Sequence, residues 1–446
     1  MHVLTYLFKD KTMNDNSLNY TKHYMINFSR AIDLISENTP CLPSELITIK
    51  QASGRILTDN VISPISVPSF NNSAMDGYAV NFESLKKANK DNPIDLQLIG
   101  LTAAGDSTAN PLSKIKSKSI SAWKIMTGAP IPNGYDSVIP IENTKIIESQ
   151  NNTQVRCFSS VNQAAHVRRC GEDFVEGQQI LTKHQQINAN RIMALASLGV
   201  AKVSVVKQPS IAVFSTGKEL VDEPEIKLRS GQIYNSNMPY ILDYLNQLPV
   251  KAYNAGTNYD DIDNYKIALQ KELDKNTNII ISTGAVSMGD FDFIPQTIIQ
   301  MGGEIIFHKS KIRPGKPILF ATFPNGSFYF GLPGNPISAA IGLRFFVSHC
   351  INLLLGLPKE SPVKAKLMSD RKKKLGFKNI LKAYAKVDKK ACMIAEISNG
   401  QESFKIQPLI DSNGWVILDE EHQQVSQDTL VDFYPSIPQL GLNFIL

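Results

Sequence analysis

The stretch FYFGLPGNPISAAIGLRFFVSHCINLLLG, Phe328 to Gly356, decides the fold of this chain. Its first residues are apolar and typical of a buried strand, a turn rich in Gly and Pro follows, and helical spacing of apolar residues begins at Ile337. Two earlier apolar strands, IAVFST and NIIIST, are also followed by a glycine-containing loop and then a helical pattern. Strand, loop and helix in repetition indicate a parallel α/β domain, which we place at residues 203–357.

The texture of the sequence is different on both sides of this domain. Short alternating segments separated by Pro, Gly and Asn indicate two β-rich modules, one before and one after it. A chain of 446 residues also exceeds what one hydrophobic core usually organises. We therefore expect a multidomain α/β plus β protein with an N-terminal extension (1–24), a discontinuous linking domain (25–66 and 161–202), a β-rich domain (67–160), the α/β domain (203–357) and a C-terminal β domain (358–446).

Composition narrows the class of protein. A hydrophobic fraction of 43% and a charged fraction of 20% are ordinary for a soluble protein, and no apolar run approaches the ~20 residues of a membrane span. The net charge of +5 is mild, so we expect no nucleic-acid partner. The main basic run, Asp370 to Lys378, reads as a solvated loop, although a small anionic ligand in a local pocket fits equally well.

The number and spacing of the cysteines indicate the cellular compartment of the protein. The chain has five, they are scattered, and none forms a C-x-x-C pair. This usage indicates neither a disulfide framework nor a structural zinc site. We therefore expect a cytoplasmic protein.

Three loops follow strands of the expected sheet, and ligands of such sheets bind outside the carboxyl ends of the strands. They are Ser215 to Leu220, Ser282 to Phe293 and Gly331 to Ser338. In the third loop two prolines fix φ, Gly334 has unusual freedom, and the following helix offers its positive N-terminal end. This pattern predicts an anion cradle, with a plain rigid turn between strand and helix as the alternative.

A basic turn adds to this interpretation. The segment KIRPGKP places Arg313 and Lys316 around a Pro-Gly turn. Two cations on one tight turn suit an oxyanion or a phosphate group, and ordinary surface cations are the alternative. The turn therefore predicts binding of a small anion.

Carboxylates occur in or near the same loops. Asp290 and Asp292 share the second loop, and we expect one of them to enter the site; Glu219 and Asp260 are further candidates. One carboxylate beside a phosphate group is a common way to hold Mg²⁺. Taken singly, each is equally an N-cap or a solvated acid, but together at the strand ends they indicate a metal and phosphate site.

A series of long motifs carries a family resemblance from about Asn27 to Leu357. The motifs are NNSAMDGYAV, IMTGAPIPNGYDSVIPIENT, VRRCGEDFVEGQQIL, ASLGV, FSTGKEL, GQIYNSN, STGAVSMGDFDF, RPGKP and LPGNPISA. In this order they resemble the molybdopterin molybdenumtransferase family, of the MoeA type that also includes the E domain of gephyrin. The resemblance implies an elongated subunit with a linking domain, an inserted β-rich domain, a molybdopterin-binding α/β domain and a C-terminal domain like a β-barrel.

The resemblance also implies an activity. Members of the family insert molybdenum from molybdate into the dithiolene of adenylylated molybdopterin, release AMP and need Mg²⁺, and so form molybdenum cofactor. They are homodimers whose cleft lies between the α/β domain of one subunit and the β-rich domain of its partner. The implied partners are small anionic substrates, the molybdopterin adenylyltransferase and molybdoenzyme apoproteins.

The family's functional positions carry over to this sequence by motif. The resemblance implies catalytic roles for Asp76, Thr127, Asp173, Glu219, Asp260 and Asp292, of which Asp292 and Glu219 would hold the metal. It implies substrate or anion binding by Thr216, Gly217, Ser236, Asn237, Gly284, Ser287, Arg313, Lys316, Pro333, Gly334, Asn335, Pro336 and Ser338. The stretch VPSFNNSAMDGYAV, Val67 to Val80, would carry Asp76 into the cleft.

Arg313 stands where many members of the family have Lys, which keeps the charge but changes the donor geometry. Five further positions depart from the family pattern: Lys218 replaces an Asp or Asn, Asn235 an Asp, Ala285 a Gly, Phe293 a Tyr and Pro295 a Lys. If the replaced glycine needs a positive φ, an alanine there costs about 1 kcal/mol. These departures motivate an alternative function, a diverged paralogue that binds molybdopterin or a partner protein without turnover.

Overall fold

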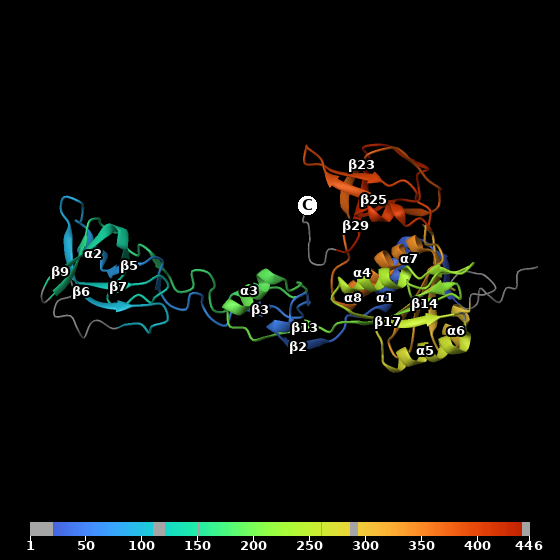
Figure 1. Cartoon of the computed structure of the whole chain (residues 1–446), viewed down its shortest axis with the longest axis horizontal. Coiled ribbons are helices and arrows are strands. Elements are labelled where there is room, and N and C mark those ends of the chain that lie inside the picture. The colour runs from blue at the N-terminus through green and yellow to red at the C-terminus, as the bar shows by residue number, and fades with distance from the viewer. Residues whose placement is uncertain (1–20, 110–120, 150–151, 260, 286–292, 439–446) are drawn as a thin grey trace, which may run out of the picture.

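The computed structural model describes residues 21–109, 121–149, 152–259, 261–285 and 293–438. The chain is elongated (Figure 1). A β-rich domain occupies one end, a slender linking region follows, and an α/β domain with a β-barrel beside it occupies the other end. The predicted multidomain α/β plus β fold is confirmed.

A seven-stranded sheet forms the centre of the α/β domain. Its order is β1 (Thr21–Ile26), β19 (Glu304–Ser310), β21 (Leu319–Thr322), β22 (Phe328–Leu332), β18 (Ile279–Thr283), β14 (Ser210–Thr216) and β17 (Lys251–Asn258). The prediction of a parallel sheet is wrong for one strand, because β21 runs antiparallel to both of its neighbours. A tight turn from Phe323 to Ser327 joins β21 to β22, and only antiparallel strands can be joined so closely.

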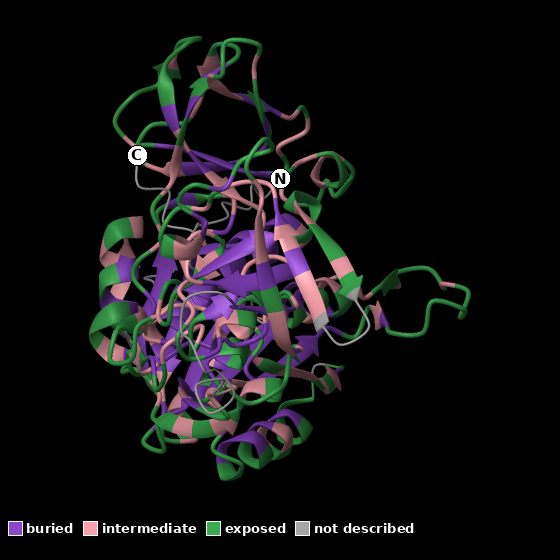
Figure 2. Cartoon of the chain, turned by 90° about the vertical axis from the view of Figure 1, so that its left-hand side faces the viewer, coloured by how far each residue is buried: buried purple, intermediate pink, exposed green. Residues whose placement is uncertain are grey.

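Helices cover both faces of this sheet. They are α1 (Phe28–Asn38), α4 (Asn237–Asn246), α5 (Ile262–Asp274), α6 (Ile294–Gln300), α7 (Pro336–Gly342) and α8 (Ser348–Leu354). A π-helical turn, Leu343–Val347, joins α7 to α8 into one continuous helix. Among the described residues this helix is the one that is long and apolar enough to cross a membrane, but 94% of its most apolar window is buried inside the protein. It is therefore a core helix; in Figure 2, where the domains overlap along the line of sight, buried elements lie near the centre of the view.

The first described residues belong to the α/β domain, not to an extension and a linking domain. Strand β1 pairs in parallel with β19, from Thr21 opposite Ile305 to Ile26 opposite Ser310. Helix α1 buries its apolar face in the same core as α4, α7 and α8. The predicted boundaries at 1–24 and 25–66 are therefore wrong here, because an amphipathic pattern does not reveal which sheet covers its apolar face.

Short ribbons form the linking region, where the chain runs outward and later returns. They are β2 (Ser44–Thr48) with β13 (Lys202–Val206), β3 (Val61–Ile62) with β12 (Gln179–Leu181), and β4 (Asn72–Ser73) with β11 (Val167–Arg168). Helix α3 (Ala189–Ser197) packs here over a small core that includes Leu57, Leu195 and Val205. The α/β domain accordingly resumes at β14, after β13.

A six-stranded sheet builds the β-rich domain. Its order is β8 (Ser137–Pro140), β5 (Gly77–Val80), β7 (Ser121–Ile125), β6 (Ile94–Thr102), β10 (Asn152–Cys157) and β9 (Thr144–Ser149), with the short helix α2 (Phe82–Leu85). Buried residues on both faces of β5, Tyr78 and Ala79 among them, belong to two small cores. Two layers of packing hold this domain independently of the α/β core.

The C-terminal domain contains a closed barrel of five strands. They are β25 (Lys378–Val387), β26 (Met393–Ile397), β23 (Val363–Leu367), β29 (Leu430–Pro435) and β27 (Gly414–Leu418), and pairing of β25 with β27 closes the barrel. From the α/β side β20 (Ile312–Arg313) pairs with the start of β25. A ribbon of β24 (Arg371–Lys372) and β28 (Gln424–Val425) and a short helix α9 (Gln407–Ile410) complete the domain. The barrel is thus attached beside the predicted basic turn.

An ion pair reinforces the junction between the α/β domain and the barrel. The Arg344 guanidinium is 1% exposed and binds both carboxylate oxygens of Glu360, at 2.7 and 2.8 Å. It also donates to the Pro435 carbonyl oxygen in the barrel. Because a bidentate arginine pair fixes orientation as well as distance, the barrel is held in one position over the sheet.

Candidate functional site

A cavity of about 750 Å³ lies at the carboxyl ends of strands β14, β18 and β22, and we call it the strand-end pocket. It is the place where ligands bind in open α/β sheets. Nine residues that the sequence predicted for binding or catalysis line it. They are Thr216, Gly217, Glu219, Ser236, Asn237, Gly284, Gly334, Asn335 and Pro336.

Five other predicted residues have different positions. Pro333 and Ser338 are buried behind the pocket wall, and Ser338 is only 4% exposed on α7. Asp260, Ser287 and Asp292 lie outside the described residues. The described wall therefore carries one predicted carboxylate, that of Glu219.

Hydrogen bonds tie the three predicted loops to one another. The Thr216 hydroxyl donates to the Thr283 carbonyl oxygen at 2.8 Å, and the Gly284 N–H donates to the Leu332 carbonyl oxygen at 3.0 Å. From the start of α4, the Asn237 amide donates to the Gly334 carbonyl oxygen at 2.8 Å. Helices α4 and α7 both begin at the pocket, so two positive helix ends favour an anion there.

The backbone of Thr216 comes so close to the residue after β18 that only a glycine, Gly284, fits there. Gly284 has φ +92°, and a Cβ atom there would lie 2.4 Å from the Thr216 carbonyl oxygen. Ala285, the next residue, has φ 52°. The condition named for this departure is therefore met, and the alanine is strained in a region that favours glycine.

Two apolar side chains of the barrel complete the strand-end pocket. Phe404 and Ile406 line it although their side chains are 63% and 42% exposed. From the α/β domain Ile233 and Tyr234, also exposed, add to this wall. These residues could not be predicted from the sequence, because an exposed apolar residue in a turn such as NGQESFKI gives no local signal of a pocket formed by distant parts of the chain. The pocket can therefore give a ligand with a flat ring both apolar contacts and polar groups.

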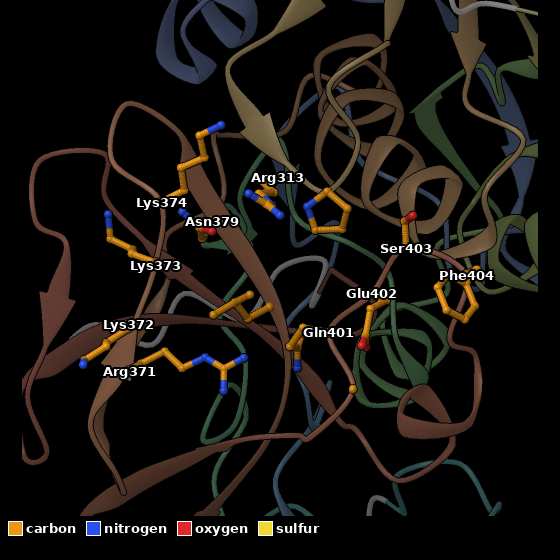
Figure 3. A pocket seen from close by; sticks show the side chains of 13 residues that line it. Arg313, Arg371, Lys372, Lys373, Lys374, Asn379, Gln401, Glu402, Ser403 and Phe404 are labelled. Carbon is orange, nitrogen blue, oxygen red and sulfur yellow. The ribbon is translucent and has the colours of Figure 1, made fainter.

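A second cavity, of about 720 Å³, lies between the barrel and the basic turn, and we call it the cationic pocket. Figure 3 shows the run Arg371 to Lys374 along one side and Gln401 to Phe404 along the other, with Arg313 at the top of the view. The run is exposed or half-buried, as predicted for a solvated loop, and it also lines this pocket, so the alternative of a small anionic ligand stays a prediction. Lys316 lines neither pocket.

Asp76 and Thr127 form a hydrogen-bonded pair in the β-rich domain. One Asp76 carboxylate oxygen accepts from the Thr127 N–H at 2.7 Å and from the Thr127 hydroxyl at 2.8 Å. Both hydrogen bonds lower the pKa of Asp76, and the bond from the Thr127 backbone N–H has the larger effect. Asp173 is exposed in a neighbouring loop, and its N–H donates to the Val67 carbonyl oxygen.

These residues are not near the strand-end pocket of the same chain. The linking region separates the β-rich domain from the α/β domain (Figure 1). One subunit therefore presents two separate groups of predicted catalytic residues, Asp76 with Thr127 at one end and Glu219 at the other.

Three of the departures from the family pattern fit their surroundings without strain, unlike Ala285. The Asn235 amide donates to the Asp222 carboxylate at 2.8 Å, where an aspartate would face a like charge. Phe293 is 9% exposed and packs edge-on against Tyr265, with ring centroids 5.5 Å apart. Pro295 stands in the first turn of α6, where proline is favoured.

In the described part of its wall, the strand-end pocket has one acidic side chain that could bind a metal, that of Glu219. Within the described ranges no group of three or more His, Cys, Asp and Glu side chains is placed to hold a metal. Mg²⁺ commonly takes one or two carboxylates together with substrate phosphates and waters. Glu219 at the strand-end pocket fits such a half-built site, in which phosphate oxygens supply further ligands.

The four-part fold and its pocket at the sheet edge define a class, the multidomain molybdopterin biosynthesis proteins. Residues 26–199 match the MoeA N-terminal region (domain I and II), and residues 212–352 match the "Probable molybdopterin binding domain". The moeA protein of Pyrococcus horikosii is similar in structure, with a TM-score of 0.75 and 25% identity, covering 92% of this chain and 99% of that one.

Sequence relatives narrow the class to one family. Molybdopterin molybdenumtransferase of Staphylococcus aureus is 33% identical over 366 residues, which are 82% of this chain and 84% of the relative. The enzyme of the same name from Synechococcus elongatus is 29% identical over 402 residues, 88% and 95% of the two chains. The chain belongs to the molybdopterin molybdenumtransferase family and is an enzyme of molybdenum cofactor biosynthesis.

Proposed function

We propose that this enzyme transfers molybdenum from molybdate to the dithiolene of adenylylated molybdopterin and releases AMP. Two Mo–S bonds form as the two thiol protons leave with one molybdate oxygen as water. A second water cleaves the phosphoanhydride, which frees AMP and leaves the phosphate on the pterin. The observation that carries the proposal is a pair of pockets that share Phe404 on their walls. One has helix ends and apolar side chains, which suit a ring and its phosphates, and the other has cationic side chains, which suit a small anion.

The strand-end pocket suits the adenylylated pterin. The N-terminal ends of α4 and α7 begin at this pocket and favour phosphate groups, and Phe404 and Ile406 offer an apolar surface to a ring. Glu219 would hold Mg²⁺, which when bound supplies positive charge to the phosphoanhydride oxygens. Asn237 orients this wall through its bond to Gly334.

The cationic pocket suits molybdate. The anion carries two negative charges, and Arg313 with the side chains from Arg371 to Lys374 lines part of the cavity with cations, opposite a wall that includes Glu402. Holding two anionic substrates near one another against their mutual repulsion is the main task of such a site, so catalysis here is chiefly positioning.

A homodimer would bring the two groups of catalytic residues together. Asp76 and Thr127 stand at the far end of the elongated subunit, so the β-rich domain of a second copy is a source of these groups for the strand-end pocket. This proposal rests on the separation within one chain. The adenylyltransferase, the apoenzyme partners and the cytoplasmic location stay predictions.

A second candidate function is binding of molybdopterin without turnover. The observation that favours it is the strained Ala285 in the strand-end pocket, where the family pattern has glycine. Tight binding of the adenylylated substrate without AMP release would decide for it.

The test is molybdate-dependent AMP release from adenylylated molybdopterin with Mg²⁺. We expect release by the native chain and a loss of more than about tenfold in Glu219→Gln and in Asp76→Asn. Glu223→Gln, which neutralises an exposed carboxylate outside the pocket, is the matched control. Release that persists in both site variants would contradict the assignment.

Mixing the two inactive variants tests the homodimer. If each cleft takes Glu219 from one subunit and Asp76 from the other, half of the clefts in a mixed dimer are intact. Equal, re-equilibrated amounts of the two variants should then recover roughly a quarter of the native rate. No recovery would show that the catalytic groups are not shared between subunits in this way.

A further inference from the structure

Lys382 is a buried lysine at the junction of the barrel and the α/β domain. It lies in β25 and is 0% exposed. Its neighbours Leu381 and Ala383 point into the barrel core, whereas Ile380 belongs to the core of the α/β domain. By the alternation of a strand, Lys382 shares the outer face of β25 with Ile380 and not the barrel interior.

A buried ammonium group needs acceptors, and Lys382 finds them in one loop. Its Nζ donates to the Gly400 carbonyl oxygen at 2.8 Å and to the Lys405 carbonyl oxygen at 2.9 Å. Two carbonyl groups five residues apart thus converge on one cation. Breaking a bond of this charge-assisted kind is expensive, because it leaves a charge unpaired out of water.

Gln401 fastens the same loop to the backbone of Lys382. Its side-chain oxygen accepts from the Lys382 N–H at 3.0 Å, and its amide nitrogen donates to the Lys382 carbonyl oxygen at 2.9 Å. The amide nitrogen also reaches the Ser398 carbonyl oxygen at 2.7 Å. Side chain and backbone of Lys382 therefore both fix the loop from Gly400 to Ile406.

This loop is the common wall of the two pockets. Gln401, Glu402 and Ser403 line the cationic pocket, Ile406 lines the strand-end pocket, and Phe404 lines both. On its other side the Ser403 carbonyl oxygen accepts from the Ile337 N–H at 3.0 Å, in the first turn of α7. The loop is therefore held between Lys382 of the barrel and the helix that begins at the strand-end pocket.

We propose that Lys382 is a positioning residue that holds the loop from Gly400 to Ile406 as a shared wall and so couples binding in the two pockets. The identity of the two substrates rests on the proposed function. Lys382 itself touches neither cavity, so it acts through the loop. Without the ammonium group, the wall loses its inner support and both pockets lose their shape together.

The experiment compares Lys382→Met, which keeps the length and removes the charge, with Lys382→Arg, which keeps the charge and the donors. Lys386→Met is the matched control, because Lys386 is an exposed lysine on the same strand and on the same face. Two properties are measured: amide hydrogen exchange at Ile337, which reports the docking of the loop on α7 without any substrate, and the KM values for both substrates.

In Lys382→Met we expect exchange at Ile337 to become about tenfold faster or more, the factor that a lost charge-assisted bond carries. We expect the KM values for molybdate and for adenylylated molybdopterin to rise together by a similar factor, with kcat within about threefold. Lys382→Arg should recover most of both effects, and Lys386→Met should show neither.

Unchanged exchange at Ile337 in a folded Lys382→Met protein would overturn the proposal. A rise in only one KM value would also overturn it, because a shared wall must affect both pockets. If Lys382→Met does not fold, Gln401→Ala removes the second attachment of the loop and must give the same paired change. Should the native chain release no AMP, the exchange measurement still tests the positioning role, so failure of the proposed function is recognised separately.

Discussion

The strand-end pocket and the cationic pocket share a wall, yet they are built in different ways. The first takes its polar character from backbone groups, loop amides and the ends of α4 and α7, with one described carboxylate and several apolar side chains. The second takes its character from long cationic side chains, Arg313 and the run from Arg371 to Lys374. Backbone groups fix the shape of a ligand, whereas flexible cations select charge and tolerate shape.

Under the proposed function, this difference would keep two anionic substrates apart in one enzyme. A phosphoanhydride attached to a ring system has a defined shape, so a rigid pocket can orient it. A small tetrahedral anion has little shape, so charge must hold it. The two pockets should therefore respond differently to substitution, to acid and to changes in backbone strain.

The largest effect is expected from Arg313→Ala. Loss of a guanidinium that binds an oxyanion costs about 1.5–3 kcal/mol, so the KM for molybdate should rise about tenfold to a hundredfold. The KM for adenylylated molybdopterin should change less than about threefold, because Arg313 does not line the strand-end pocket. Steady-state kinetics with each substrate varied in turn measures both values, and Lys311→Ala in the same turn is the control. Equal rises in both values would erase the distinction between the pockets.

Acid should weaken the helix beneath the strand-end pocket. His349 lies on α8, its Nε2 is 2.8 Å from the Ser36 hydroxyl oxygen of α1, and burial lowers its pKa to about 4. Below the ordinary pKa of about 6.5 the unfolded chain binds this proton and the folded chain does not. Stability therefore falls as the pH falls, by about 2 kcal/mol between pH 8 and pH 5.

Urea unfolding of the native chain and of His349→Gln at the two pH values checks this prediction. The glutamine removes the titrating group, so its stability should lose about 2 kcal/mol less over the same interval. His422→Gln, which removes an exposed histidine of the barrel, is the control for the loss of a histidine elsewhere in the chain. The same slope in native chain and His349→Gln would show that another group dominates the acid response.

A smaller effect is expected from Ala285→Gly. Ala285 has φ 52° at the edge of the strand-end pocket, and glycine adopts this conformation without strain. The free energy of unfolding should rise by up to about 1 kcal/mol, as measured by urea unfolding. Ala196→Gly, in the regular helix α3, should have the opposite sign and a similar size. A loss of stability in Ala285→Gly would show that the loop is not strained in the folded protein.

Much of the strand-end pocket could be predicted because its signals are local. Each strand and its loop are continuous in sequence, and the rule that parallel strands end at one edge brings Thr216, Gly284 and Gly334 together without further information. The single reversed strand β21 escaped prediction, since an apolar run shows burial and not direction. The sequence also did not predict that β1 and α1 belong to the α/β domain, since an apolar pattern does not show which sheet covers it.

The cationic pocket could be predicted only in parts. Arg313 was noted for its Pro-Gly turn and the run Asp370 to Lys378 for its charge, but nothing in the intervening sequence joins them. Pairing of β20 with β25 brings these segments to one cavity, and strand pairing between distant segments depends on the packing of whole domains. Phe404 and Lys382 escaped for this reason too.

The sequence by itself determined the family, the strand-loop-helix order of the α/β domain and the loops that form the strand-end pocket, because periodicity and turn chemistry act over a few residues. Only the tertiary structure decided that the barrel contributes a wall to this pocket, that a second pocket exists beside it, and that one buried lysine holds the loop between them. These features depend on contacts between residues far apart in the chain, which form only when separate cores dock against one another.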